Sequence, residues 1–380
     1  MNAVVNAVRE DPARRGLLYA GTERGVYVSF DDGGHWQTLR LNLPPTSVRD
    51  LVVHDSDLVV GTHGRGFWIL DDVTPLRQAA EAAAAPDAYL YRPAGAVRVR
   101  WNQNTDTPLP IDEPVGKNPP DGAMLDYYLP RPAAGPVVLE ILDRSATVVR
   151  RFSSADAVPP RDSGLNIPDW WMRPAPAVGT AAGMHRFVWD LHYPPPAALR
   201  HEYPIAAVYR DTPREPRGPW VLPGRYTVRL TVDGRTFTRA LSVAMDPRVA
   251  ASPRALQRQL ALALRVVDAL RRDSTALAAL RGVRADIGRA RPQAGAGAAA
   301  LASQLDSLDR RAGALESGDA SLARLNGQLV ELYGVIEGAD VEPTTQVEAA
   351  VRDWLGVLGT RQAEQRALEA RFRSLTRRLQ

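Results

Sequence analysis

Short apolar runs separated by turn residues fill residues 1–75 and predict β-strands. The runs are rich in β-branched and aromatic side chains, and Gly, Asp, Asn and Pro lie between them. The predicted strands are Val4–Val8, Leu17–Gly21, Val26–Phe30, Val48–Val53, Leu58–Gly61 and Phe67–Leu70. The chain therefore begins as a β region.

This β region contains an internal repeat. Leu17–Thr22 is echoed by Asp57–Thr62, and Gly25–Val28 is echoed by Gly66–Ile69, at an offset of 40 residues that becomes 41 after an insertion. A period near 40 with short strands between turns is typical of β-propeller blades. Two units are too few to close a ring, so we expect a partial β-propeller of about two blades, truncated at its amino end.

The pattern changes twice after this region. Residues 76–122 join an Ala-rich stretch to one dense in Asn, Pro and Gly, which predicts a connector with a short helix. Residues 123–245 predict a β-sandwich, with long proline-rich loops at 153–183 and 194–223. Its predicted strands are Ala123–Leu129, Val137–Leu142, Thr147–Phe152, His185–Leu191, Arg225–Val232 and Thr236–Val243.

Apolar residues take helical spacing over residues 252–380 and predict an α-helical tail. Ser252 followed by Pro253 is a strong helix start, because Ser caps free amides and Pro suits the first helical position. Gly295 marks a break, and Pro343 opens the last of four predicted helices. Four helices with short links favour an antiparallel bundle or a long helical hairpin. The fold class is thus multidomain β plus α.

Composition narrows the functional classes. The 380 residues carry 47 basic and 43 acidic side chains, and the excess of positive charge lies in the helical tail among acids. That pattern indicates a solvated helix surface and no nucleic-acid partner. The absence of cysteine excludes disulfides and thiolate metal sites. We predict no membrane span, no signal peptide and no cofactor.

The stretch from Ser29 to Trp36 is the most specific motif. It resembles the Asp box, Ser-x-Asp-x-Gly-x-Thr-Trp, of bacterial sialidases, sortilin-type propellers and related repeat proteins. Asp31 and Gly33 match the motif, and His35 replaces the usual Thr. We expect a structural role, because the carboxylate can accept amides across the hairpin, the glycine turns the chain and the Trp packs beneath it.

Three further stretches, Gly61–Asp72, Gly183–Leu191 and Leu222–Val228, extend the resemblance. Together they resemble the large secreted bacterial proteins of the sortilin-like propeller group, often labelled glycosyl hydrolase. In that group an immunoglobulin-like sandwich, like that of the flagellar hook-capping protein, and a helical tail follow the propeller. The resemblance implies a secreted or periplasmic location. It also implies propeller blades at 1–75, a connector at 76–122, an Ig-like β-sandwich at 123–245 and a helical tail at 252–380.

No residue is assigned a catalytic role. Glycoside hydrolysis needs two carboxyl groups beside the bond or a tyrosine nucleophile, and sialidases add an arginine cluster. We predict no metal site, because the histidines lack ligand spacing with acidic residues. The weak candidates for ligand contact are His63, Arg65, Asp72, Trp170 and Trp171.

Each candidate also has a structural interpretation. His63 is either an acid–base group or a loop histidine bonded to the backbone. Arg65, between two glycines, either lines a propeller channel or faces solvent. If Asp71 and Asp72 are extended, strand alternation sends them to opposite sides. The Trp pair at 170–171 is either a sugar platform or a cover packed on the sandwich.

Two functional classes remain open from the sequence. The leading one is a non-catalytic interaction or scaffold segment of an extracytoplasmic β-propeller repeat protein. Its partners are upstream propeller blades or another copy of the chain, with a protein or glycan ligand. The alternative is a sialidase-like glycosyl hydrolase whose catalytic residues lie mostly in missing upstream blades. Since an incomplete ring leaves strand edges unpaired, we also expect the lone chain to oligomerise.

Overall fold

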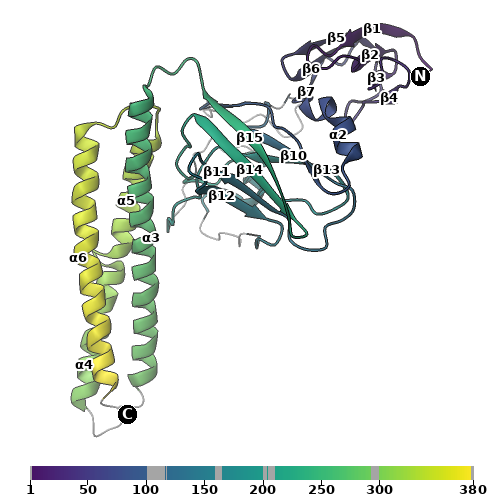
Figure 1. The fold of residues 1–380 in the computed structure, drawn as a ribbon. Coiled ribbons are helices and arrows are strands. Elements are labelled where there is room, and N and C mark those ends of the chain that lie inside the picture. Colours follow the sequence, from purple (N-terminus) through teal and green to yellow (C-terminus); the bar gives the residue numbers. More distant parts are fainter. Residues whose placement is uncertain are drawn as a thin grey trace.

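The computed structural model describes residues 2–100, 116, 118–158, 165–199, 203, 210–291 and 299–377. It contains both β-sheets and α-helices, with the long helices in the carboxy-terminal part, which confirms the mixed class. Figure 1 shows three regions in a row: the amino-terminal sheets, a middle group of sheets, and an upright helical tail. The two termini lie at opposite ends of the molecule.

Two antiparallel sheets form the amino-terminal region. The first sheet has the order β1 (Val5–Glu10), β2 (Leu18–Thr22), β3 (Gly25–Ser29) and β4 (Gln37–Thr38). The second sheet has the order β5 (Val48–His54), β6 (Asp57–Thr62) and β7 (Phe67–Leu70). Most strands lie within two residues of their predicted positions, because alternation and turn residues mark them.

The two sheets have the same pairing register. In each, the first strand pair carries one irregularity at the corresponding place. The pairs around it are Val5–Thr22 and Ala7–Gly21 in the first sheet, and Val48–Thr62 and Asp50–Gly61 in the second. The sequence repeat is therefore also a structural repeat, in which β1, β2 and β3 are equivalent to β5, β6 and β7.

The sheets stack face to face around one small core. Gly21 lies against β5, and a Cβ placed on it would lie 2.6 Å from Val48 Cγ1 and 3.1 Å from Leu51 Cδ2. The close approach of the backbone therefore requires glycine there. The other buried residues of this core include Leu17, Tyr19, Val26, Val28, Leu58 and Val60.

Two short helices and two short strands follow. They are α1 (Thr74–Arg77), α2 (Ala79–Ala84), β8 (Tyr89–Leu90) and β9 (Ala96–Arg98). Strand β8 pairs with β10, and β9 runs parallel to β15, so part of the predicted connector completes the sheets of the middle region.

The middle region has a three-stranded and a five-stranded sheet. The first has the order β13 (Gly183–Trp189), β10 (Ala123–Leu129) and β8. The second has the order β12 (Val148–Ser153), β11 (Val138–Leu142), β14 (Gly224–Val232), β15 (Arg235–Met245) and β9.

One apolar core joins these two sheets. The ring centroids of Phe152 and Phe187 are 4.6 Å apart, and those of Trp189 and Tyr226 are 5.8 Å apart. Each pair takes one ring from each sheet. Strand β14 alternates strictly between buried and half-buried residues along most of its length, as expected for a sheet with one covered face.

The helical tail consists of α3 (Pro253–Ala290), α4 (Ala299–Ser317), α5 (Leu322–Glu337) and α6 (Thr345–Thr376). The predicted cap is confirmed, because Ser252 Oγ accepts a hydrogen bond from the Ala255 amide at 3.1 Å. Figure 1 shows α4 low and α5 above it, so together they return along α3 before α6 descends again. The predicted break at Gly295 lies outside the described residues.

Candidate functional site

The hairpin between β3 and β4 uses its polar atoms internally. Asp31 Oδ1 accepts hydrogen bonds from Ser29 Oγ and the His35 amide, both at 2.8 Å. Ser29 Oγ accepts the Gly33 amide at 2.9 Å, and the φ of Gly33 is +90°. The His35 ring, 2.6 Å from Asp31 Oδ2, lowers the pKa of Asp31 to about 2, with the His35 amide and Ser29 contributing. Trp36 lies beside Gly33.

His63 and Arg65 lie in the turn between β6 and β7. Both are exposed, and the His63 amide donates to the Ser47 carbonyl at 2.8 Å. Thr62 closes the turn by donating its hydroxyl to the Gly66 carbonyl at 2.7 Å. Asp72 follows the other end of β7, so the strand separates it from the turn. These three candidates do not converge on one point.

Trp170 and Trp171 belong to a short 3-10 helix, η1 (Asp169–Trp171), in the middle region. Trp170 is exposed and Trp171 is half-buried. The Trp171 carbonyl accepts the Thr212 amide at 3.3 Å, which ties this helix to a second proline-rich loop. The pair is thus neither fully exposed nor fully packed down.

Asp72 is part of a joint between the amino-terminal and middle regions. It is buried, its φ of 56° ends the extended strand, and its carboxylate accepts the Thr74 amide at 2.9 Å. Arg186 of β13 donates to the carbonyls of Asp71 and Asp72 at 2.8 and 3.0 Å. The same guanidinium binds both carboxylate oxygens of buried Asp126, at 3.0 and 3.1 Å. We call this cluster the first joint.

A second joint connects the middle region to the helical tail. Asp340, between α5 and α6, pairs with Arg98 of β9 and lies 2.9 Å from Arg100. Arg98 also donates to the Val221 carbonyl at 2.8 Å, and Arg100 donates to the Glu337 carbonyl at 2.6 Å. Burial lowers the pKa of Arg98, although Asp340 opposes that shift. Because these charges are buried, their pairing is obligatory.

Aromatic rings line the second joint. The guanidinium carbons of Arg98 and Arg100 each lie 5.4 Å from the Trp220 ring centroid. The His192 ring lies 3.9 Å from Trp220, centroid to centroid. Burial, with Arg217 contributing, holds the pKa of His192 well below its usual value, so the imidazole is neutral. Further along, Tyr333 of α5 donates to the Arg217 carbonyl at 2.7 Å.

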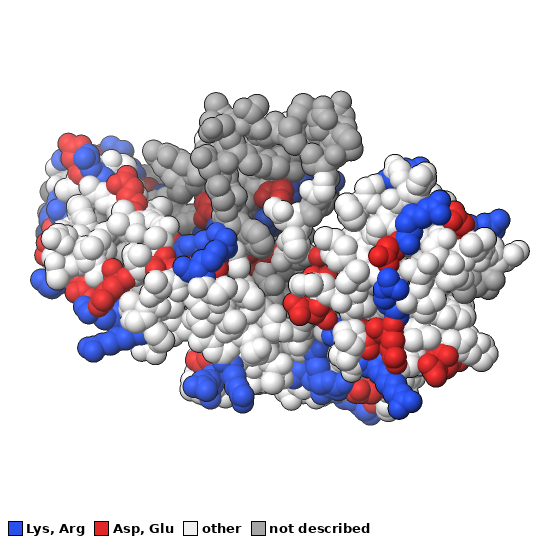
Figure 2. Space-filling model, turned by 90° about the horizontal axis from the view of Figure 1, so that it is seen from above, with Lys and Arg blue, Asp and Glu red and all other residues white. Residues whose placement is uncertain are grey.

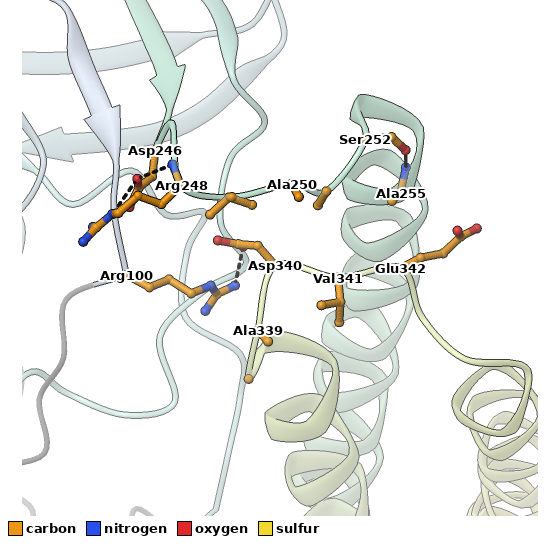
Figure 3. Close-up of a pocket in the computed structure, with 13 residues that line it drawn as sticks. Arg100, Asp246, Arg248, Ala250, Ser252, Ala255, Ala339, Asp340, Val341 and Glu342 are labelled. Carbon is orange, nitrogen blue, oxygen red and sulfur yellow. Dashed lines mark hydrogen bonds and ion pairs between the residues drawn. The ribbon is translucent and has the colours of Figure 1, made fainter.

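A pocket of about 720 Å³ lies beside the second joint (Figure 3). Arg100 and Asp340 face it from one side, and the chain from Asp246 to Ser252 faces it from the other. Its carboxylates already have guanidinium partners: Arg248 binds Asp246, and Asp340 belongs to the joint. These charges hold the protein's own segments together.

The outward face of the second sheet is apolar and exposed, and the outward face of the first sheet is exposed at β1. We define the outer face of the second sheet as Val52, Val59, Gly61, Phe67 and Ile69, which strand pairing places on one side. Phe67 is 84% exposed and Ile69 57%.

We define the outer face of the first sheet as Val5, Val8, Ala20 and Tyr27. Ala20 in its centre is buried and Tyr27 is half-buried, so the exposed part of this face is on β1. Val5 is 41% exposed and Val8 46%. Clustered apolar side chains at this exposure mark interaction surfaces.

Sequence reasoning missed both joints. Asp126 lies in the middle of an apolar strand, and that unusual position is a signal for a buried ion pair. Arg98 gives no comparable signal, because alternating Val and Arg equally suits a solvated strand.

Charge on the face shown in Figure 2 is mixed, with basic and acidic residues interspersed among uncharged ones. Within the described ranges, His, Asp and Glu side chains form no group of three that suits a metal ion. None of the helices in the described part of the chain combines the length and apolar character needed to cross a membrane. Comparison of the chain with protein-family models, curated proteins and solved structures finds no match.

Proposed function

We propose that this chain is a non-catalytic interaction and scaffold segment whose amino-terminal sheets bind a partner. The observation that carries this proposal is the exposure of Phe67 and Ile69 on the outer face of the second sheet. Removing such side chains from water contributes about 25 cal/mol per Å² of apolar surface, so a partner that covers them gains stability.

The two joints support the scaffold part of the proposal. Arg186 bonds the end of the second sheet to the middle region, and Arg98 with Asp340 bonds the middle region to the tail. If such a pair opened while its charges stayed shielded from solvent, they would have neither a counter-ion nor water, which disfavours hinge motion at either place. The chain then presents its sheets at a fixed distance from the tail.

The finer fold and location are also part of this proposal. We propose that the two amino-terminal sheets are blades of a partial β-propeller and that the middle region is an Ig-like sandwich. The repeated register of the sheets and the resemblance of the Ser29–Trp36 hairpin to an Asp box support the first assignment. The resemblance to sortilin-like propeller proteins supports a secreted or periplasmic location.

The glycosidase alternative requires carboxyl groups that are free to act on a substrate. Asp31 bonds its own hairpin, and Asp72 bonds the Thr74 amide within the first joint. Burial, with Asp57 adding to it, raises the pKa of Asp71, which is therefore the carboxyl nearest to an acid catalyst in character. The neighbouring carboxyl, Asp57, accepts the Asp72 amide at 2.9 Å, so it too bonds the protein's own backbone, which makes this alternative the weaker one.

An activity assay distinguishes these proposals. The full chain is incubated with aryl glycosides and an aryl sialoside, and release of the aryl group is measured, with Asp71→Asn and Arg65→Ala variants as matched controls. We expect no release above the rate without protein. Release that either substitution abolishes would overturn the non-catalytic proposal.

A further inference from the structure

We propose that a second copy of this chain covers the outer face of the second sheet, and that it does so with the outer face of its own first sheet. This inference rests on the proposed interaction function and deepens it by naming the partner. The repeated register carries it, because the stacked pair of sheets within one chain shows which surface fits which.

The first step concerns the face to be covered. Strand pairing makes Val26 equivalent to Phe67, Val28 to Ile69 and Gly21 to Gly61. The three residues of the first sheet are buried against the second sheet. Their three equivalents form the outer face of the second sheet and are exposed or half-buried. The same position in the repeat is therefore covered in one sheet and open in the other.

The second step concerns the covering surface. Within the chain, Val48 and Leu51 of β5 cover Gly21 and are both at most 1% exposed. Their equivalents in the first sheet are Val5 and Val8. The outer face of the second sheet therefore has no covering strand, whereas Val5 and Val8, the equivalents of the covering residues, are themselves exposed.

The third step is the glycine at the contact. A Cβ on Gly21 would collide with Val48, so the stacking of these sheets needs a residue without a side chain. Gly61 keeps that property at the equivalent position. A Cβ placed there meets only the Asp50 carbonyl oxygen at 3.6 Å and Phe67 Cε1 at 3.7 Å, both from its own sheet. The space above Gly61 is therefore free to receive Val5 of a second copy.

This contact joins two different faces, so it is head-to-tail. Each copy keeps one open face after the first contact, and further copies add until a ring closes or a filament grows. The size of the assembly follows from the rotation between stacked sheets. Association must then depend on protein concentration.

Sedimentation velocity of the full chain over a hundredfold concentration range tests the proposal. We expect the wild-type chain to grow from monomer to larger species as concentration rises. Gly61→Val fills the space that receives Val5, and Phe67→Asp places a charge on the same face. We expect both variants to stay monomeric at the highest concentration, with the circular dichroism spectrum and melting temperature of the wild-type monomer.

Val335→Asp is the matched control, because it places the same charge on an exposed valine of α5, far along the chain. We expect it to associate as the wild type does. A wild-type chain that stays monomeric throughout overturns the proposal, and so does association that neither face variant reduces. Both results leave the proposed non-catalytic function standing, because only the glycoside assay tests it.

Discussion

The two amino-terminal sheets have equivalent residues and different surroundings. Tyr19, Val26 and Val28 of the first sheet are buried in the shared core, whereas their equivalents Val59, Phe67 and Ile69 face outward. The apolar character of this face is the same in both sheets. The difference teaches that exposure here is set by the neighbouring sheet and is not a property of the repeat itself.

The largest expected effect on stability distinguishes the buried residue Leu51 from its exposed equivalent Val8. Leu51→Ala removes a side chain from the core between the sheets and should reduce the free energy of unfolding by about 2–5 kcal/mol. Val8→Ala, at the equivalent exposed position, should change it by less than about 0.5 kcal/mol. Urea unfolding at low protein concentration measures both, and equal losses would contradict the comparison.

A second substitution should change the stability of the helical tail. Asp273 of α3 is fully buried, Asn326 Nδ2 donates to its Oδ2 at 3.0 Å, and burial raises its pKa to about 6 from an ordinary value of 3.8. The folded tail therefore favours the protonated carboxyl. Asp273 costs no stability below about pH 4. The free energy of unfolding then falls as the pH rises to about 6 and is constant above that, at a total cost of about 3 kcal/mol.

Asp273→Asn should remove that cost. We expect a higher melting temperature at pH 7.5, no change near pH 4, and no shift in any transition that Leu51→Ala lowers. Calorimetry at the two pH values measures this. If both substitutions move one common transition, the sheets and the tail unfold as a unit, and the sheets cannot be compared in isolation.

Gly21 and Gly61 are equivalent positions, and we expect the same substitution to have different and smaller effects on stability at the two. Gly21→Val places methyl groups against Val48 and should destabilise the chain by about 1–3 kcal/mol through overpacking. Gly61→Val has open space above it and should leave the monomer equally stable or slightly more stable, because valine favours strands. Chemical denaturation of dilute protein distinguishes them. A similar loss in both would mean that the face above Gly61 is already covered.

The smallest effect concerns the ion pair between the sheets. Arg9 Nη2 lies 2.6 Å from Asp50 Oδ1, but both side chains are largely exposed. Such pairs contribute at most about 1 kcal/mol. We expect Arg9→Gln to change the unfolding free energy by less than that amount, also in high salt. A larger loss would show that charge, rather than apolar packing, holds the sheets together.

Most elements could be predicted from the sequence because their patterns are local. Ser252 and Pro253 identified the start of α3, and the repeat spacing identified β7 (Phe67–Leu70) to the residue. Strands β8 and β9 were missed because two or three residues carry no period. In β9 the alternation is even reversed, with Val97 exposed and Arg98 buried, since Arg98 pairs with Asp340 far along the chain.

The candidate site was less predictable, because it depends on which residues the fold brings together rather than on local patterns. His63, Arg65 and Asp72 are near one another in sequence, but β7 separates them, and the aromatic pair at 170–171 belongs to another region. The continuous apolar run of β7 predicts a strand covered on both faces, as in buried sheets. The residues that the structure describes cover one of its faces, and no local pattern reveals what covers the other.

Disulfide capture tests the stacking of two copies most directly, because the chain has no cysteine of its own. In the pair already stacked, a Cβ on Gly21 would lie 3.3 Å from Val48 Cβ, near the separation of about 3.5–4.5 Å that a disulfide needs. The equivalent contact between copies joins Val5 to Gly61, and a Val5→Cys chain lacks the valine methyl group that corresponds to the colliding Val48 Cγ1, so a side chain at Gly61 can bond to it. We therefore expect a mixture of Val5→Cys and Gly61→Cys chains to form a covalent heterodimer under mild oxidation, much faster than either variant links to itself. A mixture that links no faster than the separate variants would contradict the head-to-tail contact.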